Sequence, residues 1–308
     1  MVEITVGPND ANRRFDRFLA AYLSRANKSL IHKLLRKKRI KLNGKRAKGS
    51  EITAIGDLVT MYLAPETFNN LITEPDPIPT TGGPVDIIYE DEHILLANKP
   101  AGLLVHSDKP GGQDTLINRL VYYLQSNDIA VCNRLDRNTS GLVACGKNMP
   151  AIQALNAIFK ARMVEKIYLG VVCGTLEGKG SLQGYIIKDK NNNCSRILEN
   201  HQEGAKAVHT EYECIKAGHD FSLLKIKLHT GKSHQIRAHL ASIGHPLMGD
   251  TKYQPVSGTN RLSVGNKRGQ MLHCQIFRFL DVGEGPLGYI SGKEWQAPTP
   301  PIFYEVTK

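Results

Sequence analysis

The sequence contains no run of about 18 apolar residues, the length that a helix needs to cross a lipid bilayer. Its first residues, MVEITVGPND, lack the basic and then apolar pattern of a secretory signal peptide. The six cysteines include no Cys-x-x-Cys pair, which argues against a zinc site and against a disulfide framework. We therefore expect a cytoplasmic protein whose cysteines are reduced and mostly buried.

Acidic residues are scarce relative to basic ones. The chain has 29 Asp and Glu against 40 Lys and Arg, a net charge of +11. Residues 1–63 contain 14 of the basic and 5 of the acidic residues, so this short segment alone carries +9. Such an excess indicates a polyanionic partner, with nucleic acid as the first candidate. The alternatives are a merely solvated charged face and an acidic lipid surface; we expect no membrane binding, because no suitable amphipathic helix occurs outside this segment.

The length of 308 residues favours two domains over one. Residues 12–23 have the apolar spacing of a helix with Asn12 as its cap, and a second helix is expected after Ser29. The segment 39–46 alternates basic and apolar residues around an Asn43-Gly44 turn, which predicts a hairpin. Residues 57–63 predict another strand. We expect a small domain over residues 1–63, followed by a linker over residues 64–84 that is rich in Pro, Gly, Asn and Thr.

Residues 85–308 mix strand and helix patterns without a regular β-α-β alternation. Strands are expected near 85–90 and 94–98, and helices after Asp114 and after Pro150. This pattern predicts an α+β domain with a largely antiparallel sheet.

The most informative stretch is VCNRLDRNTSGLVACGK, residues 131–147. Its single carboxylate, Asp136, lies between Arg134 and Arg137, and nearby positive charge favours the ionised form of an acid. An ionised aspartate on a polar loop is a candidate nucleophile. A surface ion pair between Asp136 and an arginine is the alternative.

This stretch resembles the HRLDxxTSGLL signature of the RluA-type pseudouridine synthases, in the branch that includes RluC and RluD. Further segments are similar to the same family in the same order. They are NKPAGLLVH at 98–106, VEKIYLGVVCG at 164–174, LKIKLHTGKSHQIRAHLASIGHPLMGD at 224–250 and MLHCQIFRF at 271–279. The resemblance implies a pseudouridine-synthase fold for the second domain and an S4-like RNA-binding fold for residues 1–63. Residues 175–222 and the C-terminal tail match poorly.

The resemblance also implies roles for individual residues. Asp136 is the catalytic aspartate, Tyr168 the tyrosine that stacks on the target uracil, and Arg237 the partner that holds Asp136 ionised and oriented. Arg134 is the arginine that fills the place of the flipped base, and Lys166 and Lys232 add positive charge near the cleft. In the S4-like domain the RNA contacts fall to Arg36, Lys37, Lys38 and Lys41.

Two positions depart from the family pattern. Asn133 replaces the usual histidine at the start of the signature, and Lys232 replaces the usual arginine before the HQ pair. Asn133 keeps a hydrogen-bonding side chain, whereas Lys232 keeps the charge but loses the planar fork of a guanidinium. These departures affect RNA positioning more than the chemistry.

The implied reaction needs no metal, redox cofactor or energy source. His229, His234, His239 and His245 cluster in sequence, but their spacing fits neither HExxH nor a zinc finger. We therefore expect a monomeric enzyme that modifies uridines of RNA, most plausibly large-subunit ribosomal RNA. The alternatives are a synthase acting on transfer RNA, a non-catalytic RNA-binding or ribosome-assembly factor, and a glycosylase that would need a second carboxylate.

Overall fold

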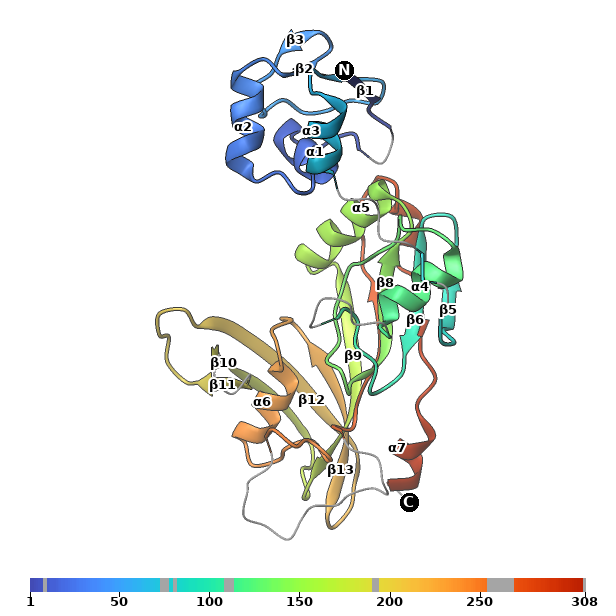
Figure 1. Ribbon diagram of the computed structural model, residues 1–308. Helices are drawn as coiled ribbons and strands as arrows, with labels where there is room; N and C mark the ends of the chain where they lie inside the picture. Colours follow the sequence, from blue (N-terminus) through green and yellow to red (C-terminus); the bar gives the residue numbers. More distant parts are fainter. Residues whose placement is uncertain are drawn as a thin grey trace. The chain divides into compact units, whose positions relative to one another are not determined.

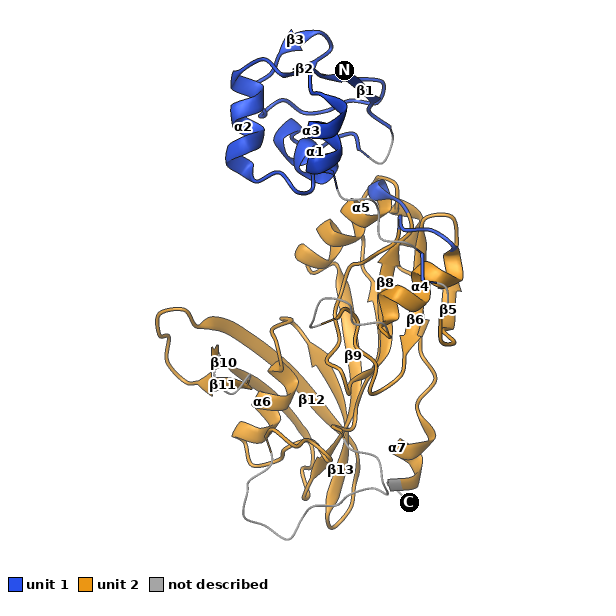
Figure 2. Cartoon of the chain, in the orientation of Figure 1, with its two compact units in different colours: residues 1–79, 125–128, 148–150 blue, residues 80–124, 129–147, 151–308 orange. Residues whose placement is uncertain are grey.

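The computed structural model describes residues 1–7, 10–72, 78–79, 82–107, 114–189, 194–253 and 269–306. The chain divides into two compact units (Figures 1 and 2). Unit 1 comprises Met1–Pro79, Gln125–Asp128 and Asn148–Pro150, and unit 2 comprises Thr80–Leu124, Ile129–Lys147 and Ala151–Lys308. The structure of each unit follows separately.

Unit 1 contains a four-stranded antiparallel sheet with the strand order β1-β4-β2-β3 and three helices. The elements are β1 (Val2–Thr5), α1 (Phe15–Tyr22), α2 (Lys28–Arg36), β2 (Ile40–Leu42), β3 (Lys45–Arg46), β4 (Leu58–Met61) and α3 (Pro65–Leu71). The predicted hairpin is the β2–β3 pair, in which Leu42 lies opposite Lys45 across the Asn43-Gly44 turn. Both turn residues have positive φ, as a two-residue hairpin turn requires.

The helices of unit 1 form because their apolar positions share one face. Phe15, Phe18 and Leu19 of α1 are fully buried in the same core as Ile31 and Leu35 of α2. The predicted cap of the first helix was wrong. Asn12 has a left-handed φ of 58°, and α1 begins only after Arg14, which occupies the cap position. The second helix begins as a capped helix should, since Asn27 accepts a hydrogen bond from the Leu30 amide at 2.9 Å.

Part of the predicted linker is helical. Pro65 occupies the first turn of α3, where its missing N–H costs no hydrogen bond. Phe68, Leu71 and Ile72 pack against the core of unit 1, which explains why this polar-looking segment folds. The prediction of an irregular linker from residue 64 was therefore wrong for residues 65–71. Residues 73–77 and 80–81 lie outside the described residues.

Unit 2 is built on one large sheet that has eleven strands within the described residues. Its main path runs β11-β10-β12-β13-β9-β14-β8-β6-β5, with β15 paired to β14 and β7 to β8. The strands are β5 (Asp86–Glu90), β6 (Ile94–Lys99), β7 (Ala130–Val131), β8 (Ser140–Gly146), β9 (Val164–Cys173), β10 (Lys179–Asp189), β11 (Cys194–Leu198), β12 (Lys206–Ala217), β13 (Phe221–Leu228), β14 (Leu272–Phe279) and β15 (Glu294–Gln296). Every pairing is antiparallel except that of β14 with β8. This confirms the prediction of an α+β fold with a largely antiparallel mixed sheet.

The remaining elements of unit 2 are helical. They are α4 (Leu116–Leu124), α5 (Met149–Lys160), α6 (Gln235–Ser242), the 3-10 turn η1 (Gly288–Ile290) and α7 (Pro301–Val306). Helix α6 packs against β11 and β12, and its Ala238 joins Ile186 and Val208 in a small buried cluster. No helix of the described residues is both long and apolar enough to span a membrane.

Strand β9 lies at the centre of the sheet, between β13 and β14. Its Tyr168 lies directly opposite Ile226 on one side and Cys274 on the other. Directly opposite residues of an antiparallel pair share a face of the sheet. The register therefore places Tyr168 on the same face of the sheet as the buried Ile226. The exposed Lys225, which precedes Ile226 on β13, belongs to the opposite face.

Candidate active site

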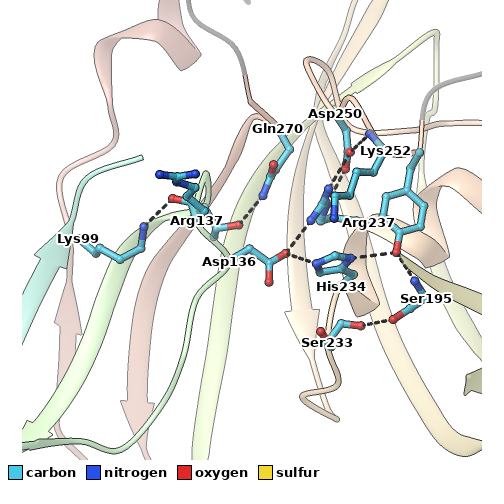
Figure 3. A network of polar contacts seen from close by, with 12 residues as sticks. Lys99, Asp136, Arg137, Ser195, Ser233, His234, Arg237, Asp250, Lys252 and Gln270 are labelled. Atoms are coloured by element: carbon cyan, nitrogen blue, oxygen red, sulfur yellow. Dashed lines mark hydrogen bonds and ion pairs between the residues drawn. The ribbon is translucent and has the colours of Figure 1, made fainter. Parts of the chain in front are cut away.

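Asp136 lies in the loop between β7 and β8 (Figure 3). The loop is closed by a hydrogen bond from the Thr139 amide to the carbonyl of Asp136 at 3.1 Å. The Thr139 hydroxyl in turn accepts a hydrogen bond from the buried Gln270 side chain at 3.1 Å. Gly141 follows with a φ of 109°, and a Cβ there would lie 2.1 Å from the Cys274 carbonyl oxygen. Because Gly141 has no Cβ, the backbone that follows the loop can pass in close contact with β14.

The carboxylate of Asp136 contacts Arg237, which is 101 residues away in sequence. Arg237 Nη1 donates a hydrogen bond to Asp136 Oδ2 at 3.0 Å. The forked face of the same guanidinium is turned to Asp250, with Nε to Oδ2 at 2.7 Å and Nη2 to Oδ1 at 2.9 Å. The bidentate geometry that suits an arginine is thus used on Asp250, and Asp136 receives a single hydrogen bond.

Asp250 was not among the residues predicted from the sequence. Its side chain is completely buried, whereas that of Asp136 is 28% exposed. Burial alone would lower the pKa of Arg237, but the hydrogen bonds and charges of Asp250, followed by those of Asp136, raise it. Arg237 is therefore a permanently charged group that is held in place by one carboxylate and presented to the other.

The two arginines that flank Asp136 in sequence lie elsewhere. The side chain of Arg137 donates from Nε to the Gly102 carbonyl at 3.2 Å, and Arg134 is exposed. Neither arginine forms an ion pair with Asp136 among the described contacts. Among the described residues, the cation that contacts Asp136 most closely is Arg237.

Tyr168 is almost completely buried in the middle of β9. Burial raises the pKa of its phenol well above the usual value, and Cys274 and the charge of Asp136 raise it further. The phenol is therefore neutral at physiological pH.

The lysines that were predicted near the cleft lie beside each other. Lys166 precedes Tyr168 by two residues, so its side chain is on the same face of β9. Burial lowers the pKa of Lys166, and the neighbouring charges of Arg162 and Lys232 lower it further. Lys232 itself is exposed. The pair places two positive charges where the turn before α6 meets β9.

Asn133, the first departure from the family pattern, is used within the fold. Its side-chain oxygen accepts a hydrogen bond from the Ala144 amide at 2.7 Å, and its amide nitrogen donates to the Leu142 carbonyl at 3.4 Å. Both partners are on β8, so Asn133 fastens the loop of Asp136 to the neighbouring strand.

Lys99 is a second residue that the sequence interpretation missed. Its side chain is completely buried, and Nζ donates to the carbonyl oxygens of Pro100 at 2.9 Å, Leu103 at 2.7 Å and Arg137 at 2.9 Å. Burial lowers the pKa of this ammonium to about 7, although the charge of Asp136 opposes the shift. Because the third acceptor is the residue after Asp136, Lys99 ties the catalytic loop to the end of β6. The sequence signal for this residue was a lysine directly after the mostly apolar strand segment ILLAN, residues 94–98.

The four histidines of the 229–245 region do not converge on one point. His234 Nε2 lies 3.8 Å from Asp136 Oδ2, His239 Nδ1 is bonded to Thr210 and His245 Nδ1 to the Cys173 carbonyl. His229 lies with His209 and Glu211, and the nearest ligand atoms of these three residues are within 4.8 Å of one another. Glu211 Oε2 lies 3.0 Å from His229 Nε2 in this trio.

The predicted RNA-contacting cations of unit 1 lie together in sequence and in structure. Arg36 ends α2, Lys37 and Lys38 form the turn that follows, and all three are exposed. Lys41 lies on β2 with its ammonium 5.1 Å from the centre of the Tyr62 ring. These side chains therefore form an exposed basic surface at the start of β2.

Comparisons with known proteins agree with this geometry. The sequence pattern of the family described as RNA pseudouridylate synthase matches residues 93–242. "Ribosomal large subunit pseudouridine synthase D" of Xylella fastidiosa (strain Temecula1) is 31% identical over 290 residues, covering 90% of this chain and 84% of that protein. The protein of the same name from Escherichia coli (strain K12) is 30% identical and covers 98% and 92%. The structure of "Human RNA Pseudouridylate Synthase Domain Containing 1" matches with a TM-score of 0.59 and 25% identity, over 74% of this chain and 87% of that one.

Proposed function

The chain belongs to the RNA pseudouridylate synthases and is an RNA pseudouridine synthase, and we propose that it modifies large-subunit ribosomal RNA with Asp136 as its nucleophile. The observation that carries the assignment of Asp136 is its contact with Arg237. The guanidinium holds one carboxylate oxygen, and the carboxylate itself remains partly exposed. The ribosomal substrate is supported by the names of the relatives from Xylella fastidiosa and Escherichia coli.

The reaction breaks the bond between N1 of uracil and C1′ of the ribose. The base then turns and C5 forms a new bond to C1′, after which C5 loses its proton and N1 gains one. Atoms and electrons balance without a cofactor, and we propose that the enzyme uses none. Asp136 attacks either C1′ of the sugar or C6 of the base, and both routes require one ionised carboxylate.

The surroundings of Asp136 suit an aspartate that must stay ionised while water is kept away. Arg237 neutralises the carboxylate through Oδ2 only, so Oδ1 is left for the substrate. Tyr168 offers a flat apolar ring against which a uracil can stack, and its high pKa keeps the hydroxyl protonated during binding. A closed stack of base and ring would exclude water from the reactive sugar.

A uridine within folded RNA has to leave its helix before it can reach Asp136. Extrusion costs a few kcal/mol, and a side chain that fills the vacated position lowers this cost. We assign this role to Arg134, which is exposed and only two residues from the nucleophile. Lys166 and Lys232 supply positive charge for the phosphates beside the extruded nucleotide.

We extend the proposal to the remaining parts of the chain. Unit 1 is an S4-like RNA-binding domain, because its small sheet and helices carry the exposed cations Arg36, Lys37 and Lys38. A monomer is sufficient, since one chain supplies Asp136 and its partners. For an enzyme that modifies ribosomal RNA we propose the cytoplasm as the place of action.

Tritium release from RNA labelled at C5 of uridine tests the proposal. The full chain and the Asp136→Asn variant would each be incubated with unmodified large-subunit ribosomal RNA and, separately, with transfer RNA. We expect release from ribosomal RNA by the wild type only, with RNA affinity unchanged in the variant. Release by Asp136→Asn at a rate near that of the wild type would refute the nucleophile.

The same experiment separates the rival functions. Release from transfer RNA alone would identify the transfer-RNA synthase of the same branch. No release from either RNA, with binding retained, would favour a non-catalytic assembly factor. Free uracil among the products would indicate a glycosylase.

A further inference from the structure

A chain of polar contacts connects β11 to the carboxylate of Asp136 (Figure 3). The backbone amide of Ser195 donates to the Tyr253 hydroxyl oxygen at 2.6 Å. The same hydroxyl lies 3.1 Å from His234 Nδ1, and His234 Nε2 lies 3.8 Å from Asp136 Oδ2. This series of contacts begins at Ser195, in a segment that resembles the family poorly, and it ends at Asp136, the candidate nucleophile.

The donors and acceptors along this series of contacts favour one tautomer of His234. The Tyr253 oxygen accepts the Ser195 N–H, and the hydroxyl has one hydrogen of its own to donate. Among the described groups, His234 Nδ1 lies within reach of that hydrogen, which favours the tautomer in which this nitrogen carries no proton. Burial lowers the pKa of His234, with Arg237 and Lys252 acting in the same direction and Asp136 and Asp250 opposing. A neutral ring whose Nδ1 is an acceptor carries its proton on Nε2, which faces Asp136.

The backbone holds the ring in this position. His234 has φ 56° and ψ 18°, a left-handed conformation that is costly for a residue with a side chain. The neighbouring carbonyl of Ser233 accepts a hydrogen bond from the Ser195 hydroxyl at 2.9 Å, so β11 fastens the turn at the residue before the strained one. The conformation turns the imidazole away from the start of α6 and toward Asp136 (Figure 3).

We propose that His234 is a positioning residue for Asp136, and that Ser195 and Tyr253 select the tautomer in which it works. His234 and Arg237 both approach Oδ2, from Nε2 and Nη1 respectively. Together they hold this oxygen and orient Oδ1 as the attacking atom. A separation of 3.8 Å is too long for a hydrogen bond, and the contact shortens when the uridine excludes water from the site. The inference rests on the proposed role of Asp136.

The test compares three variants of the full chain with the wild type. His234→Leu removes the donor, His234→Gln keeps an N–H at a similar distance from the backbone, and Tyr253→Phe removes the hydroxyl that selects the tautomer. His219→Gln is the control, because His219 is exposed and pairs with its neighbour Asp220. Single-turnover tritium release is measured at saturating RNA, together with RNA affinity and the urea midpoint of unfolding.

We expect His234→Leu to slow the single-turnover step between about tenfold and a hundredfold, as a misplaced reacting group does. His234→Gln should restore the rate to within about threefold of the wild type, while affinity and urea midpoint stay constant. A His234→Leu rate equal to that of the wild type would overturn the proposal. So would an equal loss in His234→Leu and His234→Gln, because a packing role does not depend on the N–H.

A spectroscopic measurement tests the tautomer of His234 independently of the reaction rate. In the ¹⁵N-histidine-labelled full chain, the side-chain nitrogen shifts distinguish a proton on Nε2 from one on Nδ1. We expect His234 to be in the Nε2–H form in the wild type and to become mixed in Tyr253→Phe, with other histidine signals unchanged. A proton on Nδ1 in the wild type would contradict the inference. If Asp136→Asn proved active while His234 kept the Nε2–H form, the proposed function would fail and the tautomer assignment would stand.

Discussion

The positive charges of unit 1 and those around Asp136 are placed in opposite ways. Arg36, Lys37 and Lys38 are exposed to solvent at the end of one helix. Arg237 and Lys99 are buried, and each is held by several acceptors: two carboxylates for Arg237 and three carbonyl oxygens for Lys99. Both groups of cations belong to a protein that handles a polyanion, yet their physical situations share little.

This difference in burial determines what each group of cations can do. An exposed cation interacts over distance with any phosphate, is weakened by salt, and hardly affects the stability of the fold. A buried cation must be paired in order to exist, so it fixes the positions of its partners and is sheltered from salt. In the proposed function, the exposed group would attract RNA and the buried group would hold Asp136 in position before RNA binds.

Asp250→Asn should produce the largest effect. The amide leaves the buried Arg237 without its bidentate partner, and breaking a buried pair costs about 3–5 kcal/mol. The freed fork would also turn to Asp136 and cover the oxygen that the substrate needs. We expect a lower urea midpoint and a strongly reduced rate of tritium release in the same variant.

The matched control for this variant is Asp220→Asn, since Asp220 is an exposed aspartate that pairs only with its neighbour among the described contacts. Its stability should change by less than about 0.5 kcal/mol. Equal stability of the two variants would show that the buried pair does not organise the site.

Lys99→Met should give the next largest effect, and its size should depend on pH. The variant keeps the apolar stem but removes the Lys99 donor from the carbonyls of Pro100, Leu103 and Arg137, of which only that of Arg137 keeps another donor among the described contacts, the Gly102 amide. Such a loss costs about 1–3 kcal/mol. The folded pKa of Lys99 is about 7, against 10.5 for the ordinary side chain. Between pH 7 and pH 10.5, Lys99 is protonated in the unfolded chain and largely deprotonated in the folded one. The unfolded chain then binds more protons, so the free energy of unfolding of the wild type rises with pH. Methionine does not titrate.

The stability difference between wild type and Lys99→Met should therefore widen by roughly 2 kcal/mol from pH 7 to pH 9. Urea denaturation of both proteins at the two pH values measures it. A difference that stays constant would mean that the three carbonyls keep Lys99 protonated throughout this range.

The smallest effect on stability is expected from replacing Arg36, Lys37 and Lys38 together by glutamine. These side chains are exposed, so the urea midpoint should remain close to that of the wild type. RNA affinity should fall, and the slope of log affinity against log salt should decrease by about 2–3 if all three contact phosphates. Lys179→Gln, which removes an exposed ammonium of unit 2, should leave the slope unchanged. An unchanged slope in the triple variant would contradict the placement of the phosphate contacts in unit 1.

Much of the fold follows from local patterns. The hairpin around Asn43-Gly44, the helix expected after Ser29, which begins at Lys28, and the alternating strands β13 and β14 can each be recognised within about ten residues of sequence, because side-chain periodicity is a local property. The errors also have local causes. Asn12 is a residue type that often caps helices, but here its backbone is left-handed. The segment of α3 has the composition of a linker, but it folds because Phe68 packs against the core.

The sequence by itself determined the family, the α+β class, the basic N-terminal segment and the position of Asp136 in its signature loop. Tertiary structure alone decided which groups surround that carboxylate. Arg134 and Arg137, its neighbours in sequence, form no ion pair with it among the described contacts, while Asp250, Lys99 and the path from Ser195 through Tyr253 to His234 reach the site from distant elements. Pairing across a hundred residues depends on strand register and burial, which no short stretch of sequence contains. Burial then gives these groups their altered pKa values, because charge interacts strongly only where water is absent.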